Sequence, residues 1–169
     1  MLKIVEYPHK MLRKRCQKLK VKDIQDPQIQ ELFSEMKETM VKKDGIGLAA
    51  PQVDKNLRLL VVNLKDGPSV FINPRIYWKS FFKRNIVEEG CLSFPEIFGL
   101  VKRLAWIYVS YFDQQGKFQL LKAEGLLARV LLHEIDHLNG VLFIDKIIKY
   151  TKGEDKIKKL KEQAKSNER

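Results

Sequence analysis

Two segments of the chain carry apolar residues at helical spacing. In residues 27–43 such residues recur every three or four positions, which predicts an amphipathic helix. Asp26 and Pro27 are typical of a helix start, and Gly45 lies just beyond the expected end. Residues 124–138 repeat the pattern in two adjoining apolar stripes, so we expect a second long helix there.

Shorter segments rich in β-branched and aromatic residues favour strands. The predicted strands are residues 57–64, 70–73, 86–87, 106–112 and 118–121. They surround one long helix without regular alternation of strand and helix, which predicts an α+β fold. We expect a single domain with mixed or antiparallel strands around helix 124–138, followed by a charged C-terminal helix beginning near residue 154.

The length and composition fit one soluble domain. The 169 residues suffice for one core, and 44% of them are apolar, as in ordinary globular proteins. Residues 1–6 lack the apolar segment of a signal peptide, and no apolar run approaches the roughly 20 residues that span a bilayer. We therefore expect a cytoplasmic protein with no membrane partner. Cys16 and Cys91 are too few for a disulfide scaffold, so a reduced thiol is available at either position.

The net charge of +11 favours acidic partners such as nucleic acid or the surface of a ribosome. The Lys and Arg residues are spread along the whole chain, however, which favours a solvated basic surface over a specific patch. Specific binding to DNA is not expected.

The segment His133-Glu134-Ile135-Asp136-His137 carries the clearest chemical signal. Two histidines four positions apart on a helix project from one face and can hold one metal ion. Glu134 between them is placed to exchange protons as a general acid and base. The alternative is a core helix with two hydrogen-bonded histidines, but the chain has only three histidines and two of them stand at ligand spacing.

A catalytic metal site usually needs a third protein ligand and one open position. The metzincin pattern would require histidine at residue 143, where the chain has Phe143. A thermolysin-like arrangement could use Glu154 or Glu162, both in a polar, Lys-rich tail. The remaining candidate is Cys91, whose thiolate would suit a softer metal. Alone it would more often be a small buried residue, but the adjacent Gly90 permits a close approach of the backbone.

The segment 45–52 is rich in small residues and ends at Gln52. Small side chains in series let a substrate or a catalytic centre come close, and Gln52 offers an amide donor. The alternative is a plain glycine-rich connection between a helix and a strand. The segment lacks the Lys-Ser/Thr ending of a phosphate-binding loop.

Together these segments resemble the peptide deformylase family, whose signature comprises GxGxAAxQ, EGCxS and HExxH in this order. The matches are residues 45–52, 89–93 and 133–137, and the resemblance also reaches Pro8, Leu12, Arg13, Asn73, Pro74 and Arg103. It implies metal-dependent hydrolysis of the N-formyl group from the formylmethionine that begins nascent polypeptides, with release of formate. It also implies a catalytic domain over residues 1–150 and a basic helical tail over residues 151–169.

The resemblance further implies a role for individual residues. Cys91, His133 and His137 would bind the metal, which in this family is Fe²⁺, with Zn²⁺, Ni²⁺ or Co²⁺ able to occupy the same site. Glu134 would be the general acid and base, while the Gln52 amide and the Leu92 backbone N–H would stabilise the oxyanion. The residues expected to contact the substrate are Ile46, Gly47, Gly90, Leu126, Arg129 and Val130.

Two other functional classes stay open on the sequence alone. One is the thermolysin-like metallopeptidase described above. The other is a basic, ribosome- or RNA-associated protein with a structural metal, although such a site would normally have a fourth protein ligand and none is apparent. The C-terminal helix is poor in apolar residues, so it should project from the core or lie loosely on it. It is then either a solvated surface or a site that docks on the ribosome.

Overall fold

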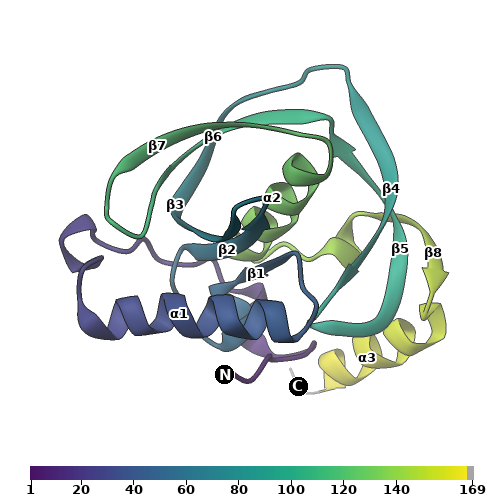
Figure 1. Cartoon of the computed structure of the whole chain (residues 1–169). Helices are drawn as coiled ribbons and strands as arrows, with labels where there is room; N and C mark the ends of the chain where they lie inside the picture. Colours follow the sequence, from purple (N-terminus) through teal and green to yellow (C-terminus); the bar gives the residue numbers. More distant parts are fainter. Residues whose placement is uncertain (167–169) are drawn as a thin grey trace.

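A computed structural model describes residues 1–166 of the chain. It contains three α-helices, α1 (Pro27–Lys42), α2 (Gly125–Leu138) and α3 (Glu154–Ser166) (Figure 1). The strands are β1 (Gly47–Ala49), β2 (Leu59–Leu64), β3 (Gly67–Lys79), β4 (Arg84–Cys91), β5 (Phe94–Leu104), β6 (Trp106–Phe112), β7 (Phe118–Glu124) and β8 (Ile147–Lys152). Short 3₁₀ helices lie at Lys10–Arg13, Val21–Asp23, Ala50–Val53 and Phe143–Asp145.

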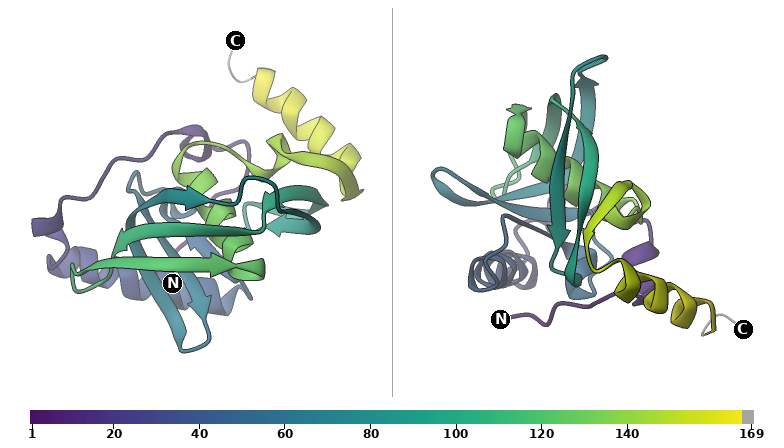
Figure 2. Two further views of the ribbon diagram at one scale, coloured as in Figure 1. Left: turned by 90° about the horizontal axis from the view of Figure 1, so that it is seen from above. Right: turned by 90° about the vertical axis from the view of Figure 1, so that its right-hand side faces the viewer.

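The strands form two antiparallel sheets. One has the order β1-β2-β3-β6-β7, and the other has the order β4-β5-β8. Helix α2 lies between them, enclosed by the long curved strands, whereas α1 covers the outer side of the first sheet (Figures 1 and 2). This arrangement confirms the α+β fold with strands around a central HExxH-bearing helix and with a C-terminal helix.

From Ala128 onward helix α2 is almost completely buried, which explains its two apolar stripes. Its side chains pack into a core that also includes Leu60, Phe71 and Val109 from the first sheet. Gly140 ends the helix with a φ of +73°, and a Cβ atom there would lie only 2.4 Å from the carbonyl oxygen of Arg13. Glycine is therefore required where the N-terminal segment passes the end of α2.

The predicted long helices and strands are present, but strands β1, β5 and β8 were not predicted. Strand β5 contains Pro95 and Gly99, residue types that are unfavourable within strands, and its buried positions alternate only from Ile97 onward. Gly99 is needed because it lies under the side chain of Ile147 on β8, and the pairing of these strands shifts register nearby. Within residues 1–166 no helix is long and apolar enough to cross a membrane.

Candidate metal centre

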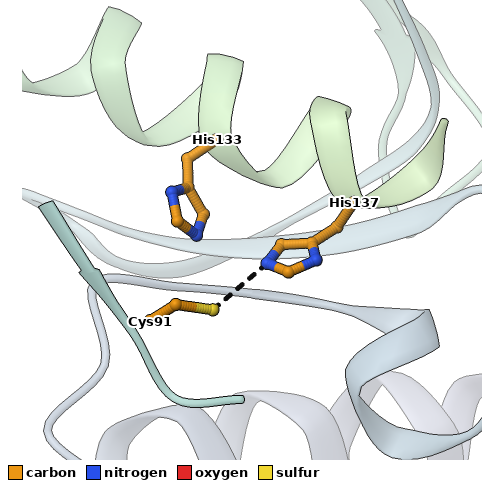
Figure 3. Close-up of side chains that lie close together, drawn as sticks. All are labelled: Cys91, His133 and His137. Carbon is orange, nitrogen blue, oxygen red and sulfur yellow. Dashed lines mark hydrogen bonds between the residues drawn. The ribbon is translucent and has the colours of Figure 1, made fainter. Parts of the chain in front are cut away.

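Cys91, His133 and His137 meet where the second sheet faces α2 (Figure 3). Their potential ligand atoms all lie within 4.8 Å of one another. The Cys91 Sγ atom is 3.2 Å from Nε2 of His137, and the centroids of the two histidine rings are 5.0 Å apart. A sulfur and two imidazole nitrogens thus converge on one point.

Local structure explains why these side chains meet. On α2 the spacing of four residues places both imidazoles on the same face, one turn apart. Cys91 is the last residue of β4 and pairs with Phe94, the first residue of β5, across a two-residue turn. This turn carries Leu92 and Ser93, so the signature around the cysteine forms a tight corner against the helix.

The chemistry of the three donors fits a metal ion. Burial lowers the pKa of His137 well below 6.5, and the nearby positive charge of Arg103 adds to the effect, so its ring is neutral and can offer a lone pair. Nδ1 of His133 lies 3.0 Å from a Glu89 carboxylate oxygen, which favours a proton on Nδ1 and leaves Nε2 for a ligand bond. A carboxylate behind a ligating histidine is usual in metal sites.

Glu89 is the centre of a buried charge network. Its two carboxylate oxygens accept hydrogen bonds of 2.9 Å from Nε and Nη2 of Arg103 and one of 2.5 Å from Nη1 of Arg129. Arg103 also pairs with Asp136 on α2. Burial alone would raise the pKa of Glu89, but the bonds from Arg103 and His133 outweigh it and hold the pKa well below its usual range. The carboxylate therefore stays ionised behind His133.

Glu134 has a different environment. Its side chain is buried, Oε2 has no hydrogen-bond partner within residues 1–166, and burial raises its pKa to about 7. A carboxyl group that titrates near neutrality can both accept and return a proton. It lies against Gly47, where a Cβ atom would come within 2.7 Å of Oε1. Gly47 thus makes the space that Glu134 occupies.

Gln52 points its amide at the sulfur. Its Oε1 accepts a hydrogen bond of 2.8 Å from the backbone N–H of Ala49, which fixes the orientation of the amide group. Nε2 is consequently directed at Cys91 Sγ, 3.4 Å away, and at the hydroxyl oxygen of Ser93, 3.3 Å away. The segment 45–52 therefore delivers a polar donor to the site, in addition to making room for Glu134.

A cavity of about 520 Å³ opens onto this group. Eleven of the twelve predicted site residues line it: Ile46, Gly47, Gln52, Gly90, Cys91, Leu92, Leu126, Arg129, Val130, His133 and Glu134. The twelfth, His137, lies behind them and reaches Cys91 through Nε2.

Two of the predicted substrate residues have structural partners of their own. The guanidinium group of Arg129 donates to Glu89 and to the carbonyl oxygens of Val101 and Asn85. The charged end of Arg129 is thus occupied by these partners, and the residue also lines the cavity. Gly90 makes room for the ring of Phe98, which would lie 2.6 Å from a Cβ atom at that position.

The alternative third ligands lie elsewhere. Glu154 is in the first turn of α3, is exposed and pairs with Lys158. Glu162 is also exposed and, like Glu154, does not line the cavity. Among residues 1–166, no carboxylate joins the two histidines as a third ligand within the distances that Cys91 satisfies. The geometry favours a site with one sulfur and two nitrogen ligands.

The comparison with known proteins identifies a family for this chain. The family model for polypeptide deformylase matches residues 1–153. A peptide deformylase of Brucella suis is 49% identical over 144 residues, which cover 82% of this chain and 81% of the relative. The chain belongs to the peptide deformylase family. It is accordingly a metal-dependent hydrolase that removes the N-formyl group from the formylmethionine of nascent polypeptides and releases formate.

Solved deformylase structures agree in fold. The crystal structure of the Thermotoga maritima peptide deformylase is 42% identical, has a TM-score of 0.82 and covers 87% of this chain and 97% of its own. A peptide deformylase from Acinetobacter baumannii, crystallised with Met-Ala-Ser bound, is 31% identical with a TM-score of 0.82, covering 86% of this chain and 98% of its own.

Sequence reasoning missed two contributors to this deformylase site. One is Glu89, which was recognised only as a letter of the EGCxS motif and not as the partner of His133. The other is Phe98, which packs over Gly90 and lines the cavity. The roles of both residues depend on contacts between strands or between a strand and α2, which sequence spacing does not reveal. The only hint in the sequence was the carboxylate of Glu89, two residues before the cysteine.

Proposed function

We propose that Cys91, His133 and His137 bind the catalytic metal and that Glu134 moves the protons of deformylation. The observation that carries this proposal is the convergence of three donors beside a buried carboxyl group whose pKa is raised to about 7. When bound, the metal would supply Lewis acidity and lower the pKa of a water molecule. Glu134 then accepts a proton from the attacking water and delivers it to the amine that leaves when the C–N bond breaks.

Gln52 and Leu92 are proposed to stabilise the negative oxygen that forms on the formyl carbon. The amide Nε2 of Gln52 is aimed at the sulfur side of the site, and Leu92 follows Cys91 in the turn, so its backbone N–H is available nearby. Donors that are fixed before the reaction stabilise a developing charge without reorganisation. The bond from Ala49 provides that fixation for Gln52.

The methionine side chain is proposed to occupy the apolar wall of the cavity. Ile46, Leu126 and Val130 supply apolar surface, and Arg129 adds its aliphatic part. Gly47 and Gly90 also line the cavity and are proposed to contact the substrate through their backbone, while the space that a side chain would need is taken by Glu134 and Phe98. A formyl group is small enough to reach the donors here, whereas a peptide bond inside a chain would bring bulk on both sides. This would explain why an HExxH site is not a general protease.

We propose Fe²⁺ as the physiological metal, in a cytoplasmic protein. A thiolate ligand suits softer metals and requires a reducing compartment, and the substrate is a nascent chain. The test is formate release from formyl-Met-Ala-Ser by protein purified without oxygen, together with metal analysis. Turnover that accompanies iron and falls on exposure to air supports the proposal. Hydrolysis of unformylated peptides in place of deformylation would refute it.

Substitution of Cys91 by Ser is expected to remove most of the bound metal, because it eliminates one of only three proposed protein ligands. Metal content measured by mass spectrometry tests this. Cys16→Ser is the matched control, since Cys16 is the other free thiol and lies outside the cavity. Full metal retention in the Cys91 variant would place the third ligand elsewhere.

Substitution of Gln52 by Leu is expected to lower kcat by about 10²–10³-fold, the scale of one lost oxyanion donor. Metal content should change little, because the amide is not a proposed ligand. Steady-state kinetics on a formyl-peptide would measure the effect. A change confined to KM would mean that Gln52 only holds the ground state of the substrate.

We also propose that residues 1–150 act as the catalytic domain and that residues 151–169 form a basic tail that docks on the ribosome. The tail holds seven Lys or Arg against four Asp or Glu. Helix α3 rests on the core through the buried Ile157 and through Lys156, which bonds to Pro95 and Glu96, while most of its other side chains are exposed. Such a helix keeps a charged face available for an acidic partner. Residues 167–169 lie outside the described part of the chain.

Deletion of residues 158–169 is expected to weaken ribosome binding while leaving turnover of short formyl-peptides nearly intact. The shortened chain keeps β8 and the buried Ile157 and loses from this core only the partly buried Leu160, so most of the packing should be retained. Co-sedimentation with ribosomes measures the effect, which should be larger at low salt because screening is then weaker. Undiminished co-sedimentation would leave the tail as a solvated surface.

A further inference from the structure

The connection between β3 and β4 projects from the body of the molecule and carries exposed aromatic residues (Figures 1 and 2). We refer to residues 77–84 as the aromatic tip. Phe82 is 96% exposed, Phe81 is 65% exposed and Trp78 is 55% exposed. Large apolar side chains with so little contact to their own protein are unfavourable in water, and several of them together usually mark an interaction site.

The exposure is held in place by hydrogen bonds. The buried Ser80 donates through its hydroxyl group to the carbonyl oxygen of Lys83, at 2.6 Å, and through its backbone N–H to the carbonyl of Trp106, at 3.1 Å. The backbone N–H of Ala105 donates to the same Lys83 carbonyl, at 3.0 Å. These bonds fix a turn that directs Phe81 and Phe82 outward. The tip is therefore a turn of defined conformation that projects from the protein.

Positive charge surrounds these rings. Lys79, Lys83 and Arg84 lie within the tip, and residues 75–87 contain no Asp or Glu. None of the three takes part in the ion pairs formed within residues 1–166. The tip thus combines apolar rings with uncompensated cations, which attracts a partner that is negatively charged on its surface and apolar underneath.

The shape of the tip narrows the choice of partner. A stable protein interface covers roughly 800 Å² on each side, which a narrow turn does not offer. Single-stranded RNA is bound in basic grooves lined with stacking platforms, whereas this feature is convex. A membrane interface accepts a narrow wedge, because aromatic rings settle at the boundary of headgroups and acyl chains while flanking Lys and Arg contact anionic lipid.

We propose that the aromatic tip inserts into the surface of an anionic membrane and attaches the enzyme there reversibly. The sequence predicted no membrane partner because it lacks a signal peptide and a bilayer-spanning run, and neither is needed for a short aromatic turn that inserts at the surface. None of residues 77–84 lines the catalytic cavity, so the bound enzyme keeps its site open. The attachment would bring the hydrolase to formylated chains at the membrane surface.

The test is co-sedimentation of the full chain with phosphatidylcholine vesicles that either contain or lack phosphatidylglycerol. We expect binding only to the anionic vesicles. Phe82→Ser should lower the partition coefficient at least about tenfold, the effect of losing one buried aromatic side chain. Phe118→Ser, at a residue that is 59% exposed on β7, is the matched control and should bind like the parent. Equal activity on a formyl-peptide would show that both variants fold.

Charge is tested separately by neutralising Lys79, Lys83 and Arg84 to Gln. This variant should lose binding to the anionic vesicles, whereas the same change at three exposed lysines elsewhere, Lys43, Lys55 and Lys65, should have little effect.

Insertion of the tip can be followed by tryptophan fluorescence. In a Trp106→Phe background Trp78 is the only tryptophan, and its emission should shift to shorter wavelength on anionic vesicles. The proposal is overturned if the Phe82 variant binds vesicles as the parent does. It is equally overturned if the parent does not bind, or if Phe82 proves to be needed for RNA binding or for dimerisation in place of vesicle binding.

Discussion

Replacing Glu134 by Gln should lower deformylation at least about a hundredfold and leave the metal in place. The rate should fall because an amide can neither accept a proton from water nor deliver one to the leaving amine. The metal should stay because Glu134 is not one of the three converging donors. The side chain keeps its size, so the neighbouring Gly47 is not disturbed.

The measurement is kcat on a formyl-peptide at equal metal content, with the metal determined by mass spectrometry. Glu134→Asp keeps the carboxyl group but withdraws it by one methylene, so its activity should lie between those of the parent and the Gln variant. A Gln variant with near-native turnover would mean that Glu134 only fills space under the site. The unpaired Oε2 and the pKa raised to about 7 make that outcome unexpected.

The features that local spacing determines could be predicted from the sequence. Helix α2 and the shared face of His133 and His137 follow from a repeat within fourteen residues. The predicted site residues outside α2 come from two further motifs, and the cavity brings these motifs together. These residues were predicted because the three motifs occur in the order typical of the family. Spacing by itself left the third ligand open.

Features that depend on tertiary contacts could not be predicted. Glu89 acquires its role from Arg103 on β5 and from His133 and Arg129 on α2, none of which is close in sequence. The apolar content of α3 suggested a loosely placed helix, yet Ile157 is buried against β5 residues such as Ile97, and Leu160 packs beside it. The same limit applies to the aromatic tip, because the sequence does not show whether aromatic rings face the core or the solvent.

Replacing Glu89 by Gln should destabilise the protein by about 3 kcal/mol or more, since breaking a buried ion pair leaves an uncompensated charge. Here two guanidinium groups, those of Arg103 and Arg129, lose their shared carboxylate. Arg103 keeps Asp136, and Arg129 keeps two backbone carbonyls, so the variant should still fold. Metal affinity should also fall, by about 10–100-fold, because His133 loses the carboxylate that orients its ring.

The free energy of unfolding is measured with a denaturant in the presence of a chelator. The chelator is needed because bound metal would add its own stabilisation to that of the charge network. Glu88→Gln is the matched control, because Glu88 is the exposed neighbour on β4 and should change stability little.

The lowered pKa of Glu89 also makes the stability of the protein depend on pH. A carboxylate whose pKa is lower in the folded state than in the unfolded state stabilises the protein fully at pH values above its unfolded-state pKa of 4.5. That stabilisation is lost as the pH falls below 4.5 toward the folded-state pKa. The difference in stability between the parent and the Gln variant should therefore shrink below pH 4.5. A difference that stays constant there would mean that packing, and not the charge on Glu89, holds this network together.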